Sequence, residues 1–170
     1  RVGVFVGEMP QAIIVRICNY DLDCVQLHGN ESGEMIDNLR RCASTDIRPG
    51  LKIIKALSVS GKADMGRWRE YEGLADMLLF DRRCDSVGGS GVQFDWSILD
   101  AYDGDIPFLL SGGIGPEDAE RIRQIDHPMF AGIDLNSRFE TEPGVKDVEK
   151  LRTFINKVRK KWKHENDKKI

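Results

Sequence analysis

The chain has 170 residues, of which 41% are hydrophobic and 31% charged, and its formal net charge is −3. This length favours one domain with a sizeable core, and a charge so near zero gives no electrostatic reason to expect nucleic acid as a partner. No apolar run in the sequence reaches membrane-spanning length, so we expect no membrane partner.

The four cysteines form no CxxC pair, which argues against a metal site of the usual ligand spacing. Cys24 lies in an apolar run and Cys18 late in a helix-like one, so both are predicted to be small buried residues rather than disulfide partners. This cysteine usage favours a cytoplasmic, thiol-reduced location.

Six short apolar runs alternate with helix-like stretches along the chain. They are apolar almost throughout, as strands covered on both faces are, and this favours a parallel sheet. We predict strands over residues 2–6, 24–28, 51–57, 76–81, 107–111 and 129–134.

Between these strands the apolar residues follow a helical period of three and four. The repeats are Ile13, Ile14 and Ile17; Met35, Ile36 and Leu39; Ala119, Ile122 and Ile125; and Val148, Leu151, Ile155, Val158 and Trp162. Pro116, followed by two acidic residues, is typical of a helix start. Six βα units with no antiparallel hairpin indicate a parallel α/β fold, either an open doubly wound sheet or a TIM barrel. In both, ligands bind beyond the carboxyl ends of the strands.

Asp81 ends the fourth predicted strand and opens into the glycine-rich stretch RRCDSVGGSG. A carboxyl group in this position can act as a general acid, although it could also cap a helix or pair with Arg82 or Arg83. The glycines of 86–91 fit either a mobile cover or a plain flexible turn, with a helix beginning near Asp95.

Two later strand ends carry features of a phosphate site. Gly112 and Gly113 would let backbone N–H groups approach an anion next to a helix start, and Asn136 and Ser137 offer small polar groups after the following strand. A tight turn alone would also explain the glycines. Asp134 would either hold loops or orient a substrate hydroxyl.

His28 ends the second predicted strand and is the one histidine at a strand end on the same rim. We count it among the candidate substrate-binding residues, although a hydrogen bond to a neighbouring backbone carbonyl is the plainer explanation of its position.

Several motifs together resemble one enzyme family. VGVFV, VQLHGNE, LLFDRRCDSVGGSGVQFDWSIL, FLLSGGIGPEDA and GIDLNSRFETEPGVKD occur in the order and at the spacing of the phosphoribosylanthranilate isomerases, over essentially the whole chain. The resemblance implies a TIM (β/α)8-type barrel, of which this chain would hold six units in one domain, 1–170. About 55–60 residues would then be missing in front. The family's general-base cysteine and the arginine that meets the substrate carboxylate would lie there.

The resemblance also implies the reaction. This is the Amadori rearrangement of N-(5-phosphoribosyl)anthranilate to 1-(2-carboxyphenylamino)-1-deoxyribulose 5-phosphate in tryptophan biosynthesis. Asp81 matches the general acid, Asp134 a residue that orients the substrate, and the phosphate loops match Gly112, Gly113, Asn136 and Ser137. No redox step occurs, so no cofactor is expected, and the only expected partners are the phosphosugar and, in a homodimer, a second copy; a monomer is equally compatible. The alternatives are another phosphosugar barrel enzyme, or an inactive barrel fragment that associates through exposed edges.

Overall fold

The structure, a computed structural model, describes residues 1–82 and 95–166. Its centre is a parallel sheet of six strands that lie side by side in sequence order. The strands are β1 (Val2–Phe5), β2 (Cys24–Leu27), β3 (Lys52–Val59), β4 (Met77–Arg82), β5 (Phe108–Leu110) and β6 (Phe130–Ile133). Each lies within two residues of its predicted range, so all six predicted strands are confirmed.

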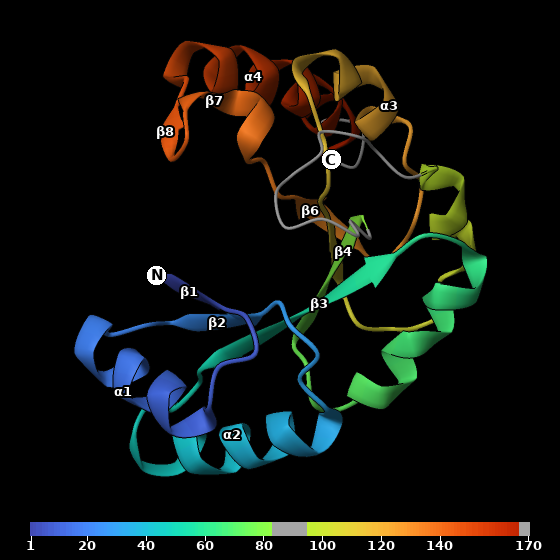
Figure 1. Cartoon of the computed structure of the whole chain (residues 1–170). Helices are drawn as coiled ribbons and strands as arrows, with labels where there is room; N and C mark the ends of the chain where they lie inside the picture. Colours follow the sequence, from blue (N-terminus) through green and yellow to red (C-terminus); the bar gives the residue numbers. More distant parts are fainter. Residues whose placement is uncertain (83–94, 167–170) are drawn as a thin grey trace.

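The connections between strands run along the outer face of the curved sheet (Figure 1). They carry α1 (Pro10–Tyr20), α2 (Gly33–Asp46), the 3-10 helices η1 (Lys62–Tyr71), η2 (Trp96–Ala101) and η3 (Pro116–Asp118), and α3 (Ala119–Arg123). After β6 come η4 (Ser137–Phe139) and α4 (Val148–Asn166). Right-handed crossovers in unbroken strand order place every connection on the same face. A doubly wound sheet would need a reversal of strand order, so the architecture is that of a barrel wall.

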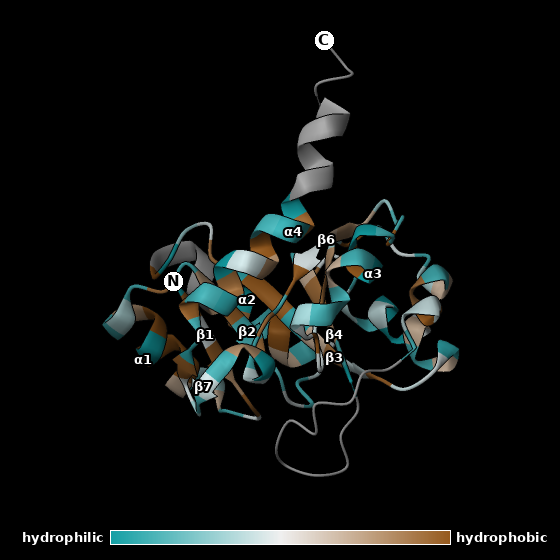
Figure 2. Ribbon diagram, turned by 90° about the horizontal axis from the view of Figure 1, so that it is seen from above, coloured by the Kyte–Doolittle hydropathy of each residue, from teal (hydrophilic) through white to brown (hydrophobic). Residues whose placement is uncertain are grey.

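The predicted helical faces are largely confirmed. Ile13 and Ile17 of α1 and Ile36 and Leu39 of α2 are buried against the sheet. In α4, Leu151 and Val158 of the predicted face pack against the core, but Val148 and Ile155 are exposed, and the fully buried residue is Phe154, which the prediction missed. Figure 2 shows the same arrangement, with hydrophobic residues along the strands and hydrophilic residues on the outer sides of the helices.

A short antiparallel hairpin corrects the prediction that the chain has none. β7 (Glu140–Glu142) pairs with β8 (Val145–Lys146). Gly144 makes the turn at φ +82°, a conformation that glycine adopts without strain. Strands of two or three residues are too short for an alternating pattern to show in the sequence.

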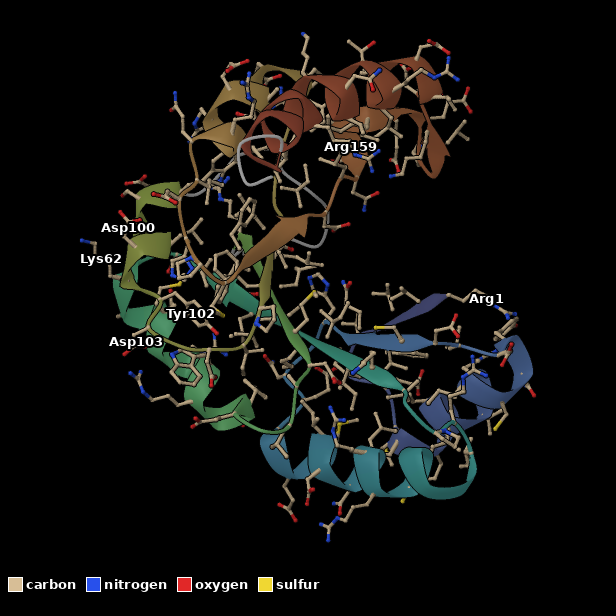
Figure 3. All side chains as sticks on the ribbon, turned by 180° about the vertical axis from the view of Figure 1, so that it is seen from behind. Arg1, Lys62, Asp100, Tyr102, Asp103 and Arg159 are labelled. Carbon is tan, nitrogen blue, oxygen red and sulfur yellow. The ribbon has the colours of Figure 1, made fainter. Side chains whose placement is uncertain are left out.

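An aromatic cluster holds the outer layer against β4 and β5. Tyr102 makes edge-on contacts with Phe80, Phe108 and Trp68, and its hydroxyl donates to the Ile106 carbonyl at 2.7 Å. Burial raises the pKa of Tyr102 to about 12. Tyr102 and Asp103 lie beside η1 (Figure 3), where Asp103 accepts a hydrogen bond from the Trp68 indole. This packing fixes β4, the strand that carries Asp81.

Both outer strands of the described sheet have an open edge, since β1 pairs only with β2 and β6 only with β5. The side chains of Val2 and Val4 on β1 are 54% and 58% exposed. Beside β6 lies an apolar cavity of about 400 Å³, whose walls include Phe130, Ile133, Leu135, Phe154, Ile155 and Val158.

The two cysteines predicted to be buried differ. Cys24 is partly buried in β2, but Cys18 is exposed, so that prediction was wrong for Cys18. The reason is that Cys18 follows the buried Ile17 directly and so points away from the sheet. Within 1–82 and 95–166, no helix combines the length and the apolar character needed to cross a bilayer.

Candidate active site

A cavity of about 190 Å³ opens at the carboxyl ends of the strands, and all of the predicted site residues line it. They are His28, Asp81, Gly112, Gly113, Asp134, Asn136 and Ser137, joined by Ser111, Ile114 and Arg138. These residues come from loops that are far apart in the sequence, and parallel strands bring them together because their carboxyl ends share one edge of the sheet. The proton donor and the anion-binding loops expected from the sequence therefore face one space.

Asp81 is paired with a histidine from the end of β2. Its Oδ2 lies 3.1 Å from Nε2 of His28, and its Oδ1 accepts the Arg82 backbone N–H at 2.8 Å. Both side chains of the pair are about a quarter exposed, 27% and 26%. The carboxyl group is thus held by two contacts and still open to the cavity.

The contacts of His28 identify its tautomer. Its Nδ1 lies 2.9 Å from the Gln26 side-chain nitrogen, which can only donate. With the Gln26 amide assigned in this orientation, Nδ1 is the acceptor, and the matching tautomer carries its proton on Nε2, from which it donates to Asp81. The plainer expectation for His28, a hydrogen bond to a neighbouring carbonyl, is wrong because both ring nitrogens are used by side chains.

Gly112 is the point of closest approach between Asp81 and the glycine turn. A Cβ atom at this position would lie 2.8 Å from Oδ1 of Asp81 and 2.9 Å from the Arg82 nitrogen. Gly112 and Gly113 also have φ values of +89° and +67°, which side-chain-bearing residues rarely adopt. Only a glycine fits here, and the turn presents bare backbone to the cavity.

The helix expected beside this turn has a carboxylate of the chain at its own N-terminus. The helix begins three residues later, at Pro116, and the Gly115 amide donates to Oδ2 of Asp118 at 2.7 Å. Because the chain supplies its own carboxylate at that end, the helix dipole is already compensated. The Gly112–Gly113 turn is the part of the motif that reaches the cavity.

Asp134 and Asn136 are held by side chains of neighbouring segments. Oδ2 of Asp134 accepts the Ser111 hydroxyl at 3.1 Å, which links the ends of β5 and β6. Oδ1 of Asn136 accepts Nζ of Lys146 from the β7–β8 hairpin. Asp134 therefore holds two loops together, and its second oxygen is the one left for a ligand.

A buried ion pair beside the cavity was missed by the sequence analysis. Lys55, 1% exposed, lies 3.0 Å from Oε2 of Glu31 and donates also to the carbonyls of Leu27, Gly29 and Ala56. Glu31 in turn accepts the amides of Gly7 and Gly29. The pair thus fixes the loops after β1 and β2, including the residue that follows His28. A lysine inside the apolar run KIIKALSV was the available signal.

Hydrogen bonds and mutual attraction stabilise the ionised forms of Glu31 and Lys55. Burial raises the pKa of Glu31, but hydrogen bonds from the Gly7 amide, its own amide and Lys55 outweigh this and leave the pKa below its ordinary value. Burial lowers the pKa of Lys55, and the attraction of Glu31 opposes that change.

The predicted helix start near Asp95 is confirmed. η2 begins at Trp96, and Oδ1 of Asp95 caps it by accepting the Ser97 amide at 3.0 Å. The predicted cover over 86–91 and the residues Arg83 and Cys84 lie outside the described residues.

Comparisons with known proteins agree on one family. Residues 1–157 match the family described as N-(5'phosphoribosyl)anthranilate (PRA) isomerase. A protein of that name from Parabacteroides distasonis is 51% identical over 158 residues, which cover 93% of this chain and 68% of the relative. Another, from Phocaeicola vulgatus, is 42% identical over 95% of this chain and 75% of its own length.

Solved structures agree with the sequence matches. The phosphoribosyl anthranilate isomerase of Thermus thermophilus superposes with a TM-score of 0.76 at 30% identity, over 93% of this chain and 71% of that one. A phosphoribosyl anthranilate isomerase in complex with reduced 1-(o-carboxyphenylamino)-1-deoxyribulose 5-phosphate superposes at 0.71, also at 30% identity, over 94% and 71%. The fold is accordingly six βα units of a TIM (β/α)8-type barrel. From its sequence and its fold together, this chain belongs to the N-(5'-phosphoribosyl)anthranilate isomerase family.

Proposed function

We propose that the chain works as an N-(5'-phosphoribosyl)anthranilate isomerase in tryptophan biosynthesis and rearranges its substrate without a redox cofactor. The family match supports the reaction. The observation that carries the proposal is that Asp81 and the Gly112–Gly113 turn border the same cavity. A phosphosugar whose phosphate lies at the turn would therefore place its ring within reach of the carboxyl group.

Asp81 is the proposed general acid. It would protonate the ring oxygen of the furanose, so that the ring opens and an iminium forms. The carboxylate left behind would be stabilised by two donors already in place, Nε2–H of His28 and the Arg82 backbone N–H. Stabilising the conjugate base of the acid lowers the barrier to proton transfer, and general acid catalysis of this kind contributes about 10²–10⁴ in rate.

The binding residues have separate proposed roles. Backbone N–H groups of Gly112 and Gly113, with Asn136 and Ser137 from the loop after β6, would bind the phosphate. Asp134 would orient the substrate through the carboxylate oxygen that does not bind Ser111. After ring opening, a base must remove the proton from C2 of the sugar to give an enolamine, which tautomerises to the ketone.

We infer that this base belongs to two further βα units that complete the barrel. The open edges of β1 and β6 support the inference, as does the apolar cavity beside β6. The first two relatives are longer than the matched region, which covers 68% and 75% of them. Six units are three quarters of an eight-unit barrel, in line with that coverage. On this proposal, residues 1–170 form one domain together with the added units.

The proposed partners and location follow from the proposed isomerase function. The ligand is a small phosphosugar in a cytoplasmic enzyme that is either a monomer or a homodimer. One solved relative is described as monomers of the dimeric phosphoribosylanthranilate isomerase from Thermotoga maritima, which is compatible with both states.

The test is product formation by the purified chain, whose intact mass should be 19.2 kDa. We would supply phosphoribosylanthranilate and follow the ketone carbonyl of the product by ¹³C NMR, with the chain alone and mixed with the part of the Parabacteroides distasonis relative that it does not match. We expect product from the mixture. A mixture that binds substrate but forms no ketone would contradict the proposed isomerase function. Equal turnover by the chain alone would contradict the inference that the general base belongs to two further βα units.

A further inference from the structure

The charge of the cavity poses a problem for a phosphate ligand. The carboxylate of Asp134 and the acid Asp81, which becomes a carboxylate when it gives up its proton, face the same space, and a phosphate ester carries about −1.5 to −2 charges near neutral pH. Backbone amides supply partial charges only. Among the described residues that line the cavity, Arg138 is the only lysine or arginine. It is the group able to offset the accumulated negative charge.

The guanidinium of Arg138 lies between the Gly113 carbonyl and the side chain of Glu117. Its Nη1 lies 3.4 Å from the Gly113 carbonyl, a long contact, and its Nη2 lies 2.5 Å from Oε1 of Glu117. Between the two, the guanidinium lies over Gly115, where an added Cβ would come 2.7 Å from Cζ. Arg138 itself follows Ser137 directly. One side chain thus touches both loops to which phosphate binding is assigned.

The present partner of Arg138 is a weak one. The two side chains of the Arg138–Glu117 pair are 36% and 56% exposed, and ion pairs so open to water contribute little. A guanidinium prefers phosphate, because two parallel N–H donors match two phosphate oxygens and each bond is charge-assisted. Exchanging an exposed carboxylate for a phosphate dianion is therefore favourable.

We propose that Arg138 is a phosphate-binding residue that leaves Glu117 when the phosphate of the substrate enters the cavity. The inference rests on the proposed function, and it adds a charged ligand to a site otherwise built from backbone and small polar groups. It also makes Glu117 a competitor of the substrate. Removing Arg138 and removing Glu117 should then change phosphate affinity in opposite directions.

The experiment is a titration of the full chain with inorganic phosphate, followed by ¹⁵N NMR at the amides of Gly112, Gly113 and Ser137. We expect Arg138→Gln to weaken binding about tenfold or more, and Arg138→Lys to recover part of the loss, since it keeps the charge but not the planar donor pair. Glu117→Gln should tighten binding about two- to fivefold. The matched control is Arg152→Gln, which breaks an arginine–glutamate pair on α4 that does not line the cavity.

Ionic strength gives a second readout that a packing role would not change. The salt dependence of phosphate affinity should be shallower in Arg138→Gln than in the wild type, because one charge fewer is screened. Unchanged affinity and salt dependence in Arg138→Gln would overturn the role of Arg138 while leaving the phosphate site in place. No phosphate-dependent shift at the three amides of the wild type would overturn both the site and this inference.

Discussion

Two polar clusters lie at the carboxyl-end rim of the sheet, and they differ in how far their polar groups are buried and paired with other groups of the protein. In the inner cluster, Glu31 and Lys55 have side chains only 2% exposed, and the protein supplies every partner described for them. In the site cluster around Asp81, His28 and Asp134, the side chains of the acid and its histidine are about a quarter exposed.

The difference separates structure from function. A buried charge must be fully paired, because an unpaired one costs several kcal/mol, so the inner cluster has nothing left to offer a ligand. The carboxylates of the site cluster each keep an oxygen or an open side toward the cavity. We therefore expect mutations in the inner cluster to affect folding and mutations in the site cluster to affect the reaction.

The largest effect should come from Asp81→Asn, which keeps the shape of the side chain but removes its proton. We expect the rate of isomerisation to fall by about 10²–10⁴, with the free energy of unfolding and the affinity for inorganic phosphate nearly unchanged. Turnover assays of the variant mixed with the part of the Parabacteroides distasonis relative that the chain does not match, and phosphate titrations of the same preparation, check this. Wild-type turnover by the variant would remove Asp81 from its proposed role.

Lys55→Met should have the largest effect on stability. The substitution leaves the Glu31 carboxylate buried without its cation, and breaking such a pair costs about 3–5 kcal/mol. Urea unfolding measures the loss. The double variant Glu31→Gln with Lys55→Met is the control, and it should lose less than the sum of the two single variants, since neither charge then remains. Simple additivity would contradict a coupled pair.

Gly112→Ala should affect both properties, because the position is strained and crowded. Left-handed backbone costs a non-glycine residue about 1–2 kcal/mol, and the added Cβ would also push Asp81 out of position. The matched control is Gly144→Ala, since Gly144 has a similar φ of +82° but no atom near its Cβ. We expect both variants to lose stability and only Gly112→Ala to lose turnover. Equal turnover in the two variants would contradict the idea that the Gly112–Gly113 turn keeps Asp81 in position.

The smallest effect concerns pH and a residue outside both clusters. Burial raises the pKa of Asp76, but hydrogen bonds from Arg40, the Ile53 amide and Lys52 outweigh this and hold the pKa below its usual value. A carboxyl with a lowered folded-state pKa stabilises the fold above its ordinary pKa, and this contribution is lost as the pH falls through the folded-state value.

Asp76→Asn should accordingly cost about 1 kcal/mol at pH 7 and progressively less below about pH 4. Urea unfolding at several pH values measures this difference. Asp37→Asn serves as the control, because the Asp37–Arg41 pair is exposed and contributes little. A difference from wild type that stays constant down to pH 3 would contradict the assignment.

Local patterns were enough to locate the strands and the candidate site. Each strand is a continuous apolar run, and a parallel topology forces the ends of such runs to one edge, so Asp81, Gly112 and Ser137 could be placed together before any coordinates were known. The same reasoning missed the β7–β8 hairpin, whose strands are too short to show a period. It also missed Phe154, the fully buried residue of α4.

By itself, then, the sequence determined the parallel α/β class, the positions of the strands, the rim that carries the candidate site and, through its motifs, the family of the chain, because these depend on residue type and spacing along the chain. The choice of a barrel over a doubly wound sheet came from the family resemblance and from the observed strand order. Only the tertiary structure decided which side chains pair with one another. That His28 donates to Asp81, that Lys55 pairs with Glu31 and that Arg138 reaches across to Glu117 depend on side chains meeting across 53, 24 and 21 positions of sequence. No local pattern encodes such distances, since they arise when the sheet curves and brings separate loops to one point.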